Sequence, residues 1–170
     1  QFVEWGGINN TNNSITITAS IDTTFTAIFE PATYDSSAVV INEINYNSAN
    51  DYDAQDWVEL TNNGGGPVNL SGWQFKDEDD SHIFIIPEQT LLENGGFIVL
   101  AEDTAVFNGF FPGIGPVVGN LSFGLSGGGE LIRLYDANSV FIDQVMYDDN
   151  DPWPEEADGG GPALELINPI

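Results

Sequence analysis

The sequence predicts an all-β fold in which two sheets pack as a sandwich. Short runs rich in β-branched and aromatic residues recur along the 170-residue chain, and several alternate apolar with polar positions, as strands do. Gly, Pro and Asn separate the runs, because glycine supplies positive φ and proline cannot continue a strand ladder. No helical run interrupts this pattern. Many short strands joined by frequent turns indicate a β-sandwich.

Three strands are expected between residues 39 and 75. Alternating apolar residues mark the first at 39–46 and the second at 57–60. The sequence Asn-Asn-Gly-Gly-Gly-Pro at 62–67 then breaks the pattern. The third strand is expected at 68–75, where it ends in Gly-Trp-Gln-Phe.

Further strands follow the same rule toward the C-terminus. Pro87 ends one of them, and Asn94-Gly95 is a hairpin turn signal before another. Residues 104–119 are rich in Phe, Gly and Pro without a clear period, so we expect a loop with one helical turn near residues 104–107. The remaining strands are expected at 82–86, 97–101, 122–125, 131–136, 140–147 and 164–167.

The N-terminal part reads as a separate unit. Runs of Thr, Ile and Phe predict strands at 15–19 and 25–29, which we expect to pair as a β-hairpin within residues 1–31. Such a hairpin cannot bury a core alone. We expect a linker at 32–37 and the sandwich at 38–170. Because the chain begins inside a strand pattern, we also expect it to be a fragment of a longer protein.

The order of the sandwich segments is similar to that of a known family. Ile-Asn-Glu-Ile at 41–44, Trp-Val-Glu-Leu-Thr-Asn at 57–62 and Val-Asn-Leu-Ser-Gly-Trp-Gln-Phe at 68–75 resemble the lamin tail domain in its bacterial form. The likeness extends over residues 38–169. It implies an immunoglobulin-like β-sandwich of about 8–9 strands without a catalytic centre. It also favours Trp73 as a core residue.

Residues 1–31 show a second resemblance. Their pattern Phe-x-x-Trp-x-Gly, Ile-Thr-Ile-Thr and Asp-Thr-Thr-Phe-Thr-Ala-Ile-Phe resembles the closing half of a repeat common in bacterial surface proteins. Together, the two resemblances imply a non-catalytic binding or attachment module of a larger secreted or cell-surface bacterial protein. The expected location is therefore extracellular or at the cell surface, and the expected partner is a protein or polysaccharide surface.

The charge balance excludes several classes of partner. The chain has 27 Asp and Glu residues but only two basic ones, Lys76 and Arg133, which gives a net charge of −25. Such a surface repels the phosphate backbone of nucleic acids and anionic lipid headgroups. We therefore expect no nucleic-acid binding. No apolar run has the length needed to span a bilayer, so we also expect no direct membrane insertion. The chain has no cysteine and hence no disulfides.

Carboxylates are the most abundant chemically active side chains, and they point to Ca²⁺ as the one candidate cofactor. Calcium takes six to eight oxygen ligands, which acidic loops can supply. Asp77, Asp79 and Ser81 have the 1, 3, 5 spacing of a calcium loop, but His82 replaces the glycine that an EF-hand needs. A solvated acidic surface is the alternative interpretation. The candidate metal ligands are Asp77, Asp79, Asp148, Asp149 and Asp151.

Trp153 is the candidate for direct ligand binding. It lies in the sequence Asp-Pro-Trp-Pro, and flanking prolines hold a ring rigidly, which lowers the ordering cost of binding. One alternative function is therefore a polysaccharide-binding accessory domain of an extracellular hydrolase. Another is a calcium-stabilised spacer domain.

Enzymatic activity is not expected. Gly-Leu-Ser-Gly-Gly at 124–128 fits the Gly-x-Ser-x-Gly pattern of a nucleophile elbow. That chemistry needs a helix after the serine and a histidine base, whereas glycines follow Ser126 and the only histidine, His82, lies upstream. We interpret the pattern as a glycine-rich turn.

Overall fold

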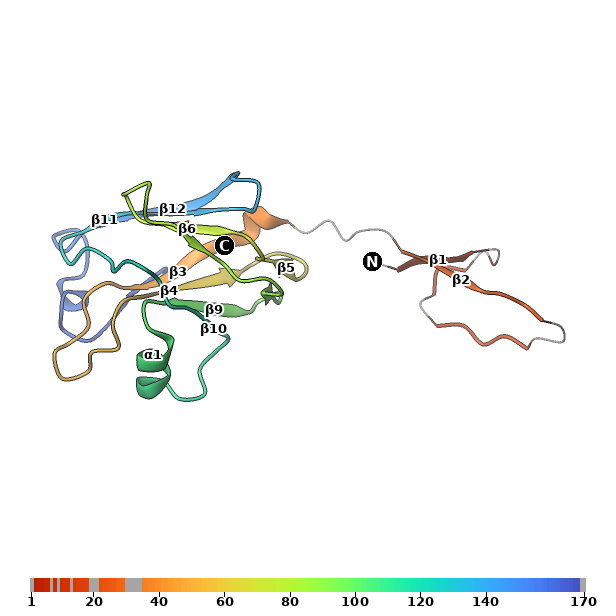
Figure 1. Ribbon diagram of the computed structural model, residues 1–170, viewed down its shortest axis with the longest axis horizontal. Helices are drawn as coiled ribbons and strands as arrows, with labels where there is room; N and C mark the ends of the chain where they lie inside the picture. Colours follow the sequence, from red (N-terminus) through yellow and green to blue (C-terminus); the bar gives the residue numbers. More distant parts are fainter. Residues whose placement is uncertain are drawn as a thin grey trace. The chain divides into compact units, whose positions relative to one another are not determined.

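The computed structural model describes residues 2–6, 8, 10–12, 14–18, 22–29 and 35–168. These residues belong to two compact units, one within residues 1–33 and one within residues 34–170. Both are built from strands (Figure 1), so the all-β prediction is confirmed. None of the described helices has the length and apolar character needed to cross a bilayer.

The N-terminal unit contains an antiparallel strand pair, but not the expected one. Strand β1 (Phe2–Gly6) pairs with β2 (Thr26–Phe29), and Trp5 lies opposite Ala27. The strand predicted at 15–19 is wrong for residues 15–18, which have no strand assignment, while residue 19 lies outside the described residues. Its Thr and Ile residues have strand propensity, but propensity does not choose a partner, and β1 takes the place beside β2.

The larger unit contains a five-stranded sheet with the strand order β10-β9-β4-β3-β13. Its neighbouring strands are antiparallel except β9 and β10, which are parallel. The strands are β3 (Val39–Asn45), β4 (Trp57–Asn62), β9 (Phe97–Ala101), β10 (Val117–Gly119) and β13 (Leu164–Glu165).

A four-stranded antiparallel sheet with the order β12-β11-β6-β7 forms the second layer (Figure 1). Its strands are β6 (Gln74–Lys76), β7 (Phe84–Ile85), β11 (Glu130–Tyr135) and β12 (Phe141–Tyr147). The short strands β5 (Val68–Asn69) and β8 (Leu91–Leu92) form a separate pair. Two short 3-10 helices are also present, η1 (Ser36–Ala38) before β3 and η2 (Glu155–Ala157) between β12 and β13.

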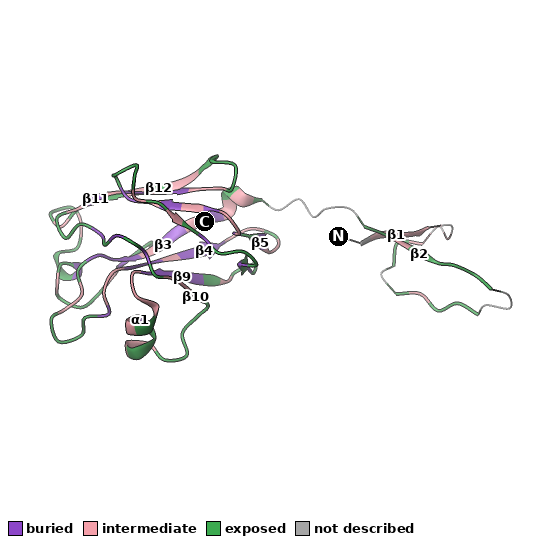
Figure 2. Cartoon of the chain, in the orientation of Figure 1, coloured by how far each residue is buried: buried purple, intermediate pink, exposed green. Residues whose placement is uncertain are grey.

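The main core lies between these two sheets (Figure 2). Val58 and Leu60 from β4 and Ile132 and Leu134 from β11 are fully buried there, because alternate residues of each strand face the opposite sheet. Trp73 is only 4% exposed and belongs to the same core, as the sequence led us to expect.

Two strands predicted in the larger unit are divided or absent, and the strands predicted at 82–86 and 164–167 are shorter, at Phe84–Ile85 and Leu164–Glu165. The single strand expected at 68–75 is divided into β5 and β6 by a turn, in which Gly72 has a φ of +76° and the Asn69 side chain accepts the N–H of Ser71. Residues 122–125 are not a strand, because the backbone N–H of Leu125 donates to the Asp56 carboxylate instead of to a neighbouring strand.

A short helix replaces the first part of the loop expected at 104–119. Helix α1 (Thr104–Phe110) begins at Asp103, whose carboxylate accepts the N–H groups of Ala105 and Val106 and so caps the helix. The helix is longer than the single turn predicted. It buries Phe107 and is followed by β10, which lies next to β9 at the edge of the five-stranded sheet.

Candidate ligand-binding pocket

The two faces of strand β4 have different surroundings. Val58 and Leu60 face the main core, whereas Trp57 faces outward and joins a second, smaller apolar cluster with Val99 and Phe107. Glu59 shares this outer face because successive strand residues point to opposite sides. The outer face of the sheet is therefore partly covered by α1 and the segment after it.

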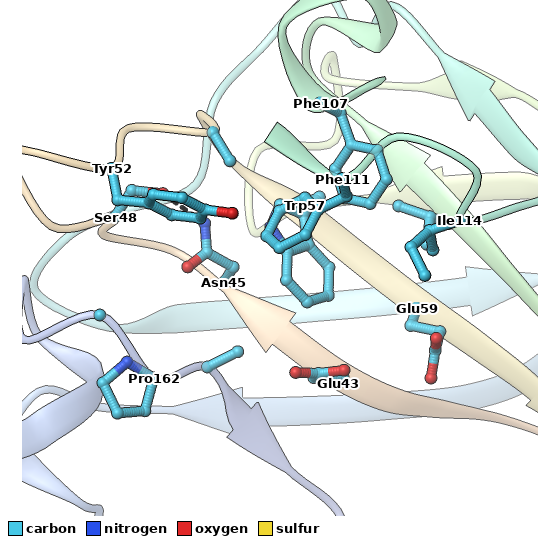
Figure 3. Close-up of a pocket in the computed structure, with 14 residues that line it drawn as sticks. Glu43, Asn45, Ser48, Tyr52, Trp57, Glu59, Phe107, Phe111, Ile114 and Pro162 are labelled. Carbon is cyan, nitrogen blue, oxygen red and sulfur yellow. Dashed lines mark hydrogen bonds between the residues drawn. The ribbon is translucent and has the colours of Figure 1, made fainter. Parts of the chain in front are cut away.

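A pocket of about 430 Å³ opens on this outer face (Figure 3). Its floor comes from β3, β4 and β9, and its walls come from residues 48–54, α1 with the segment that follows it, and residues 161–163. Aromatic side chains from three of these segments converge on it, and carboxylates and amides line the remainder. The aromatic lining residues are Tyr52, Trp57, Phe107 and Phe111, and the polar ones are Glu43, Asn45, Ser48 and Glu59.

The aromatic rings hold one another by edge-to-face contacts. The Trp57 ring centroid lies 5.7 Å from that of Phe107 and 6.2 Å from that of Phe111, each with an interplanar angle of 77°. Tyr52 contacts Phe111 in the same way at 5.7 Å. Trp57 is 8% exposed, and its indole Nε1 is buried without a hydrogen-bond partner among the described residues. A buried donor without an acceptor is unfavourable unless a ligand or water satisfies it.

Three glutamates occupy adjacent strands in one row. Glu43 in β3 lies opposite Glu59 in β4 on one side and opposite Glu165 in β13 on the other. Burial raises the pKa of Glu43 to about 7, and the charges of Glu59 and Glu165 add to the effect. Burial also raises the pKa of Glu59, although Asn42 donates a hydrogen bond of 2.8 Å to its carboxylate, which opposes the rise. The row therefore concentrates negative charge that the sheet itself does not neutralise.

A polar corner completes the pocket. The Asn45 amide donates hydrogen bonds of 2.8 Å to the Ser48 hydroxyl and to the Gln55 carbonyl. These bonds hold the loop after β3 against the start of β4, so the polar groups have fixed positions before any ligand arrives. Pre-positioned polar groups lower the ordering cost of binding.

Asp77 and Asp79, two of the predicted metal ligands, are engaged in local bonds. Asp77 is buried, its carboxylate lies 2.6 Å from Nδ1 of His82, and it also accepts the N–H of Asp79. Asp79 is exposed, and its carboxylate accepts from the backbone and hydroxyl of Ser81. The carboxylates therefore stabilise the turn between β6 and β7.

The second predicted group lies after β12. Asp148 and Asp151 are exposed, Asp149 is half-buried, and Asn150 donates to both Asp148 and Asp149. Within the described part of the chain, no three His, Cys, Asp or Glu side chains come together in a way that could hold a metal ion. Calcium binding by these loops stays a prediction.

Trp153 lies away from the Trp57 pocket. It is half-buried, packs against the main core and lines a different cavity of about 420 Å³ together with Ile44 and Leu164. Ser126 lies in the loop before β11, where its hydroxyl accepts the N–H of Gly128, and no helix follows it before β11. The serine therefore has the turn environment that the sequence predicted.

The residues that line the Trp57 pocket were not among the site residues predicted from the sequence. Alternation placed Trp57 and Glu59 on one face of their strand, but it gave no sign that β13 would bring Glu165 beside Glu43. A signal was present in β4, because a large aromatic residue such as Trp57 on the outward face of a strand is unusual for a fully solvated face. The aromatic walls from residues 104–114 could not be foreseen without the helix.

Comparison with known proteins agrees with the fold. A profile of the lamin tail domain family matches residues 32–149, and the chain belongs to this family. The lamin tail domain is a non-catalytic family with an immunoglobulin-like fold.

Among solved structures, the chain is similar to a DUF4876 family protein from Bacteroides thetaiotaomicron, with 12% identity and a TM-score of 0.46. The match covers 68% of this chain and 55% of that one, so this chain spans about half the length of that protein. A likeness at this level carries no argument about function. A search of curated proteins finds no match.

Proposed function

We propose that the chain is a binding module through which a larger secreted or cell-surface protein attaches to another protein. Membership of a non-catalytic family supports a binding role over catalysis. The strongly acidic composition supports a partner that is not a nucleic acid or an anionic membrane. The attachment itself is assigned to the pocket around Trp57.

The observation that carries this proposal is the aromatic pocket on the outer face of the five-stranded sheet. The solvent face of an antiparallel sheet normally presents polar side chains to water. Here Trp57, Phe107 and Phe111 make that face concave and apolar, while Asn45 and Ser48 offer fixed polar groups beside them. A concave apolar surface with a few placed polar groups is the usual form of a binding site.

A protein partner fits this pocket better than a polysaccharide. Sugar rings stack on the open faces of aromatic side chains, whereas Trp57 is largely covered by its neighbours and Trp153 packs against the core. Protein partners instead insert individual side chains into pockets that contain buried aromatic residues. Polysaccharide binding remains an outcome that the experiment below would reveal.

The proposal is tested by NMR titration of the ¹⁵N-labelled chain with a panel of short peptides and neutral oligosaccharides. We expect peptides to shift the backbone signals of Asn45, Val99 and Phe107 and the indole N–H signal of Trp57. Signals on the four-stranded sheet, such as those of Ile132, serve as the internal control. Shifts confined to that sheet, or shifts caused only by oligosaccharides, would contradict the proposal.

A further inference from the structure

We propose that the Trp57 pocket binds a lysine or arginine side chain from a basic segment of the protein partner. This inference rests on the proposed function, because it names the chemistry that the same pocket would recognise. It combines three features of the pocket, which are a row of carboxylates, a set of aromatic walls and a buried donor without a partner.

The carboxylate row needs a cation from outside the sheet. Glu43 and Glu59 both line the pocket, and Glu165 extends their row on the next strand. Carboxylates opposite one another on neighbouring strands repel, since such positions are only about 5 Å apart at Cβ. A bound ammonium or guanidinium group between Glu43 and Glu59 would turn this repulsion into two charge-assisted interactions.

The chain has no cationic side chain of its own to place there. Its two basic residues both belong to the four-stranded sheet, where Lys76 lies over the Tyr135 ring at 5.5 Å and Arg133 pairs with Asp80 at 2.9 Å. Its one histidine, His82, is engaged with Asp77. A positively charged side chain that complements the pocket would therefore come from another molecule.

The aromatic walls suit the same ligand. A cation within about 6 Å of an aromatic ring is attracted by the electron density of the ring face. Tyr52, which is 47% exposed, is more accessible to such a cation than Trp57, which its neighbours largely cover. Figure 3 shows the Trp57 indole between the aromatic residues and the two glutamates, with Tyr52 on one side and Ile114 on the other. The alkyl stem of a lysine or arginine would lie along Ile114 and Phe111, because such side chains bury their stems against apolar surface.

The unpaired donor favours a peptide over a small amine. The Trp57 Nε1 hydrogen has no acceptor among the described residues, although the indole is more than nine-tenths buried. A peptide carries a carbonyl oxygen at every residue, and one of these would accept from Nε1 once the side chains that cover this buried atom shift on binding. The Glu43 and Glu59 row would then hold the side chain while the tryptophan holds the backbone.

Other ligands fit less well. An anionic ligand would be repelled by the three glutamates. A metal ion is not supported, because the described side chains include no suitable group of three ligands. A neutral sugar would leave the glutamates without a counter-charge.

The test uses NMR titration of the full chain with blocked five-residue peptides of glycine that carry a central lysine, arginine or norleucine. Norleucine has the shape of the lysine stem but no charge. We expect the lysine and arginine peptides to shift the Trp57 indole N–H signal. Their dissociation constant should be about 1 mM, because a single side chain contributes only a small binding free energy. The norleucine peptide should bind at least about tenfold more weakly.

Matched variants locate the effect. The double variant Glu43→Gln/Glu59→Gln should weaken lysine-peptide binding by about tenfold. The control Glu88→Gln/Glu93→Gln removes the same charge from exposed loops elsewhere and should leave binding within about twofold of the original chain. The comparison of lysine with norleucine on the unaltered chain does not depend on any variant folding.

The outcomes separate the inference from the proposed function. The cation inference is overturned if the lysine and norleucine peptides bind the pocket equally, or if both double variants lose the same affinity for the lysine peptide. The pocket would then still be a protein-binding site. If neutral oligosaccharides such as cellohexaose shift the pocket signals and none of the peptides does, the inference is overturned. The partner would then be a polysaccharide and not a protein. If no probe shifts the pocket signals, both proposals are wrong.

Discussion

The two faces of the five-stranded sheet differ in character although the same strands build both. The inner face is largely apolar, with Val58, Leu60 and Leu100 fully buried against the second sheet. On the outer face, glutamates and an asparagine lie beside Trp57, and only a short helix and adjoining segments cover them. The inner face therefore carries most of the apolar burial, while the outer face holds the half-buried carboxyl groups of Glu43 and Glu59 and the unpaired indole donor of Trp57. The main core also contains one such group, the buried hydroxyl of Tyr46, which has no partner among the described residues.

This difference is informative because groups that destabilise a fold usually have another role. Glu43 and Glu59 do not belong to the apolar inner core. Carboxylates with raised pKa values in a concave site are candidates for function, since folding alone would favour their replacement by uncharged residues. The predictions below test this contrast between the faces, beginning with the largest effect.

Truncation of the inner core should be far more costly than truncation of the pocket wall. Trp73→Ala should lower the free energy of unfolding by about 3–5 kcal/mol, because it empties a large buried site. Tyr52→Ala on the outer side should cost about 1 kcal/mol, because Tyr52 is 47% exposed and loses one hydrogen bond, to the Phe110 carbonyl. Urea unfolding of both variants measures the difference, and equal losses would contradict the contrast.

The outer face should make stability depend on pH. The folded-state pKa of Glu43, about 7, lies above its usual value of 4.5, so the folded chain holds this proton more tightly than the unfolded chain. The contribution of Glu43 to stability is therefore greatest at or below about pH 4.5 and is lost as the pH rises toward about 7. Asp56 acts in the same direction, since burial raises its pKa to about 7 as well.

The variant Glu43→Gln isolates the contribution of the pocket to this dependence. Glutamine resembles the protonated acid, so the variant should melt at a higher temperature than the original chain at about pH 8 and at a similar temperature near pH 4.5. Thermal unfolding at both pH values measures it, with Glu88→Gln as the exposed control. A variant that melts lower at pH 8 would show that Glu43 stabilises the fold through its charge.

Salt should stabilise the chain more gradually than a bound ion would. About 0.15 M NaCl should raise the melting temperature, because it screens the repulsion within a net charge of −25. Against that background, CaCl₂ and MgCl₂ should then have equal effects if the acidic loops are solvated surface. A larger shift with about 1 mM Ca²⁺ that saturates, and that Asp148→Asn/Asp151→Asn removes, would instead establish a calcium site outside both sheet faces.

Removal of the N-terminal unit should have the smallest effect. Deleting residues 1–34 should change the melting temperature of the sandwich by less than about 2 °C, because each unit has its own strand pairing. Calorimetry of the shortened chain tests this. Loss of the cooperative transition would show that the sandwich depends on the N-terminal segment.

The sequence predicted the fold well and the candidate site poorly. Local alternation identified β3, β4, β9, β11 and β12 close to their observed positions, and the motif order identified the family. The main errors in strand prediction fell at 15–18, 68–75 and 122–125. There, residues with strand-forming side chains lie partly or wholly in turns or loops. At 122–125 the backbone instead bonds to a side chain, and at 68–75 a glycine with positive φ interrupts the strand.

What the sequence determined by itself is local. Alternation sets which residues of β4 share a face, turn residues set where strands end, and composition sets the negative charge. Tertiary structure alone decided that β13, from the end of the chain, pairs with β3, and that α1 covers the outer face of the sheet. Pairing between strands far apart in sequence depends on the packing of the whole core, which no short pattern records. For this reason the glutamate row and the aromatic walls came together only in the folded chain.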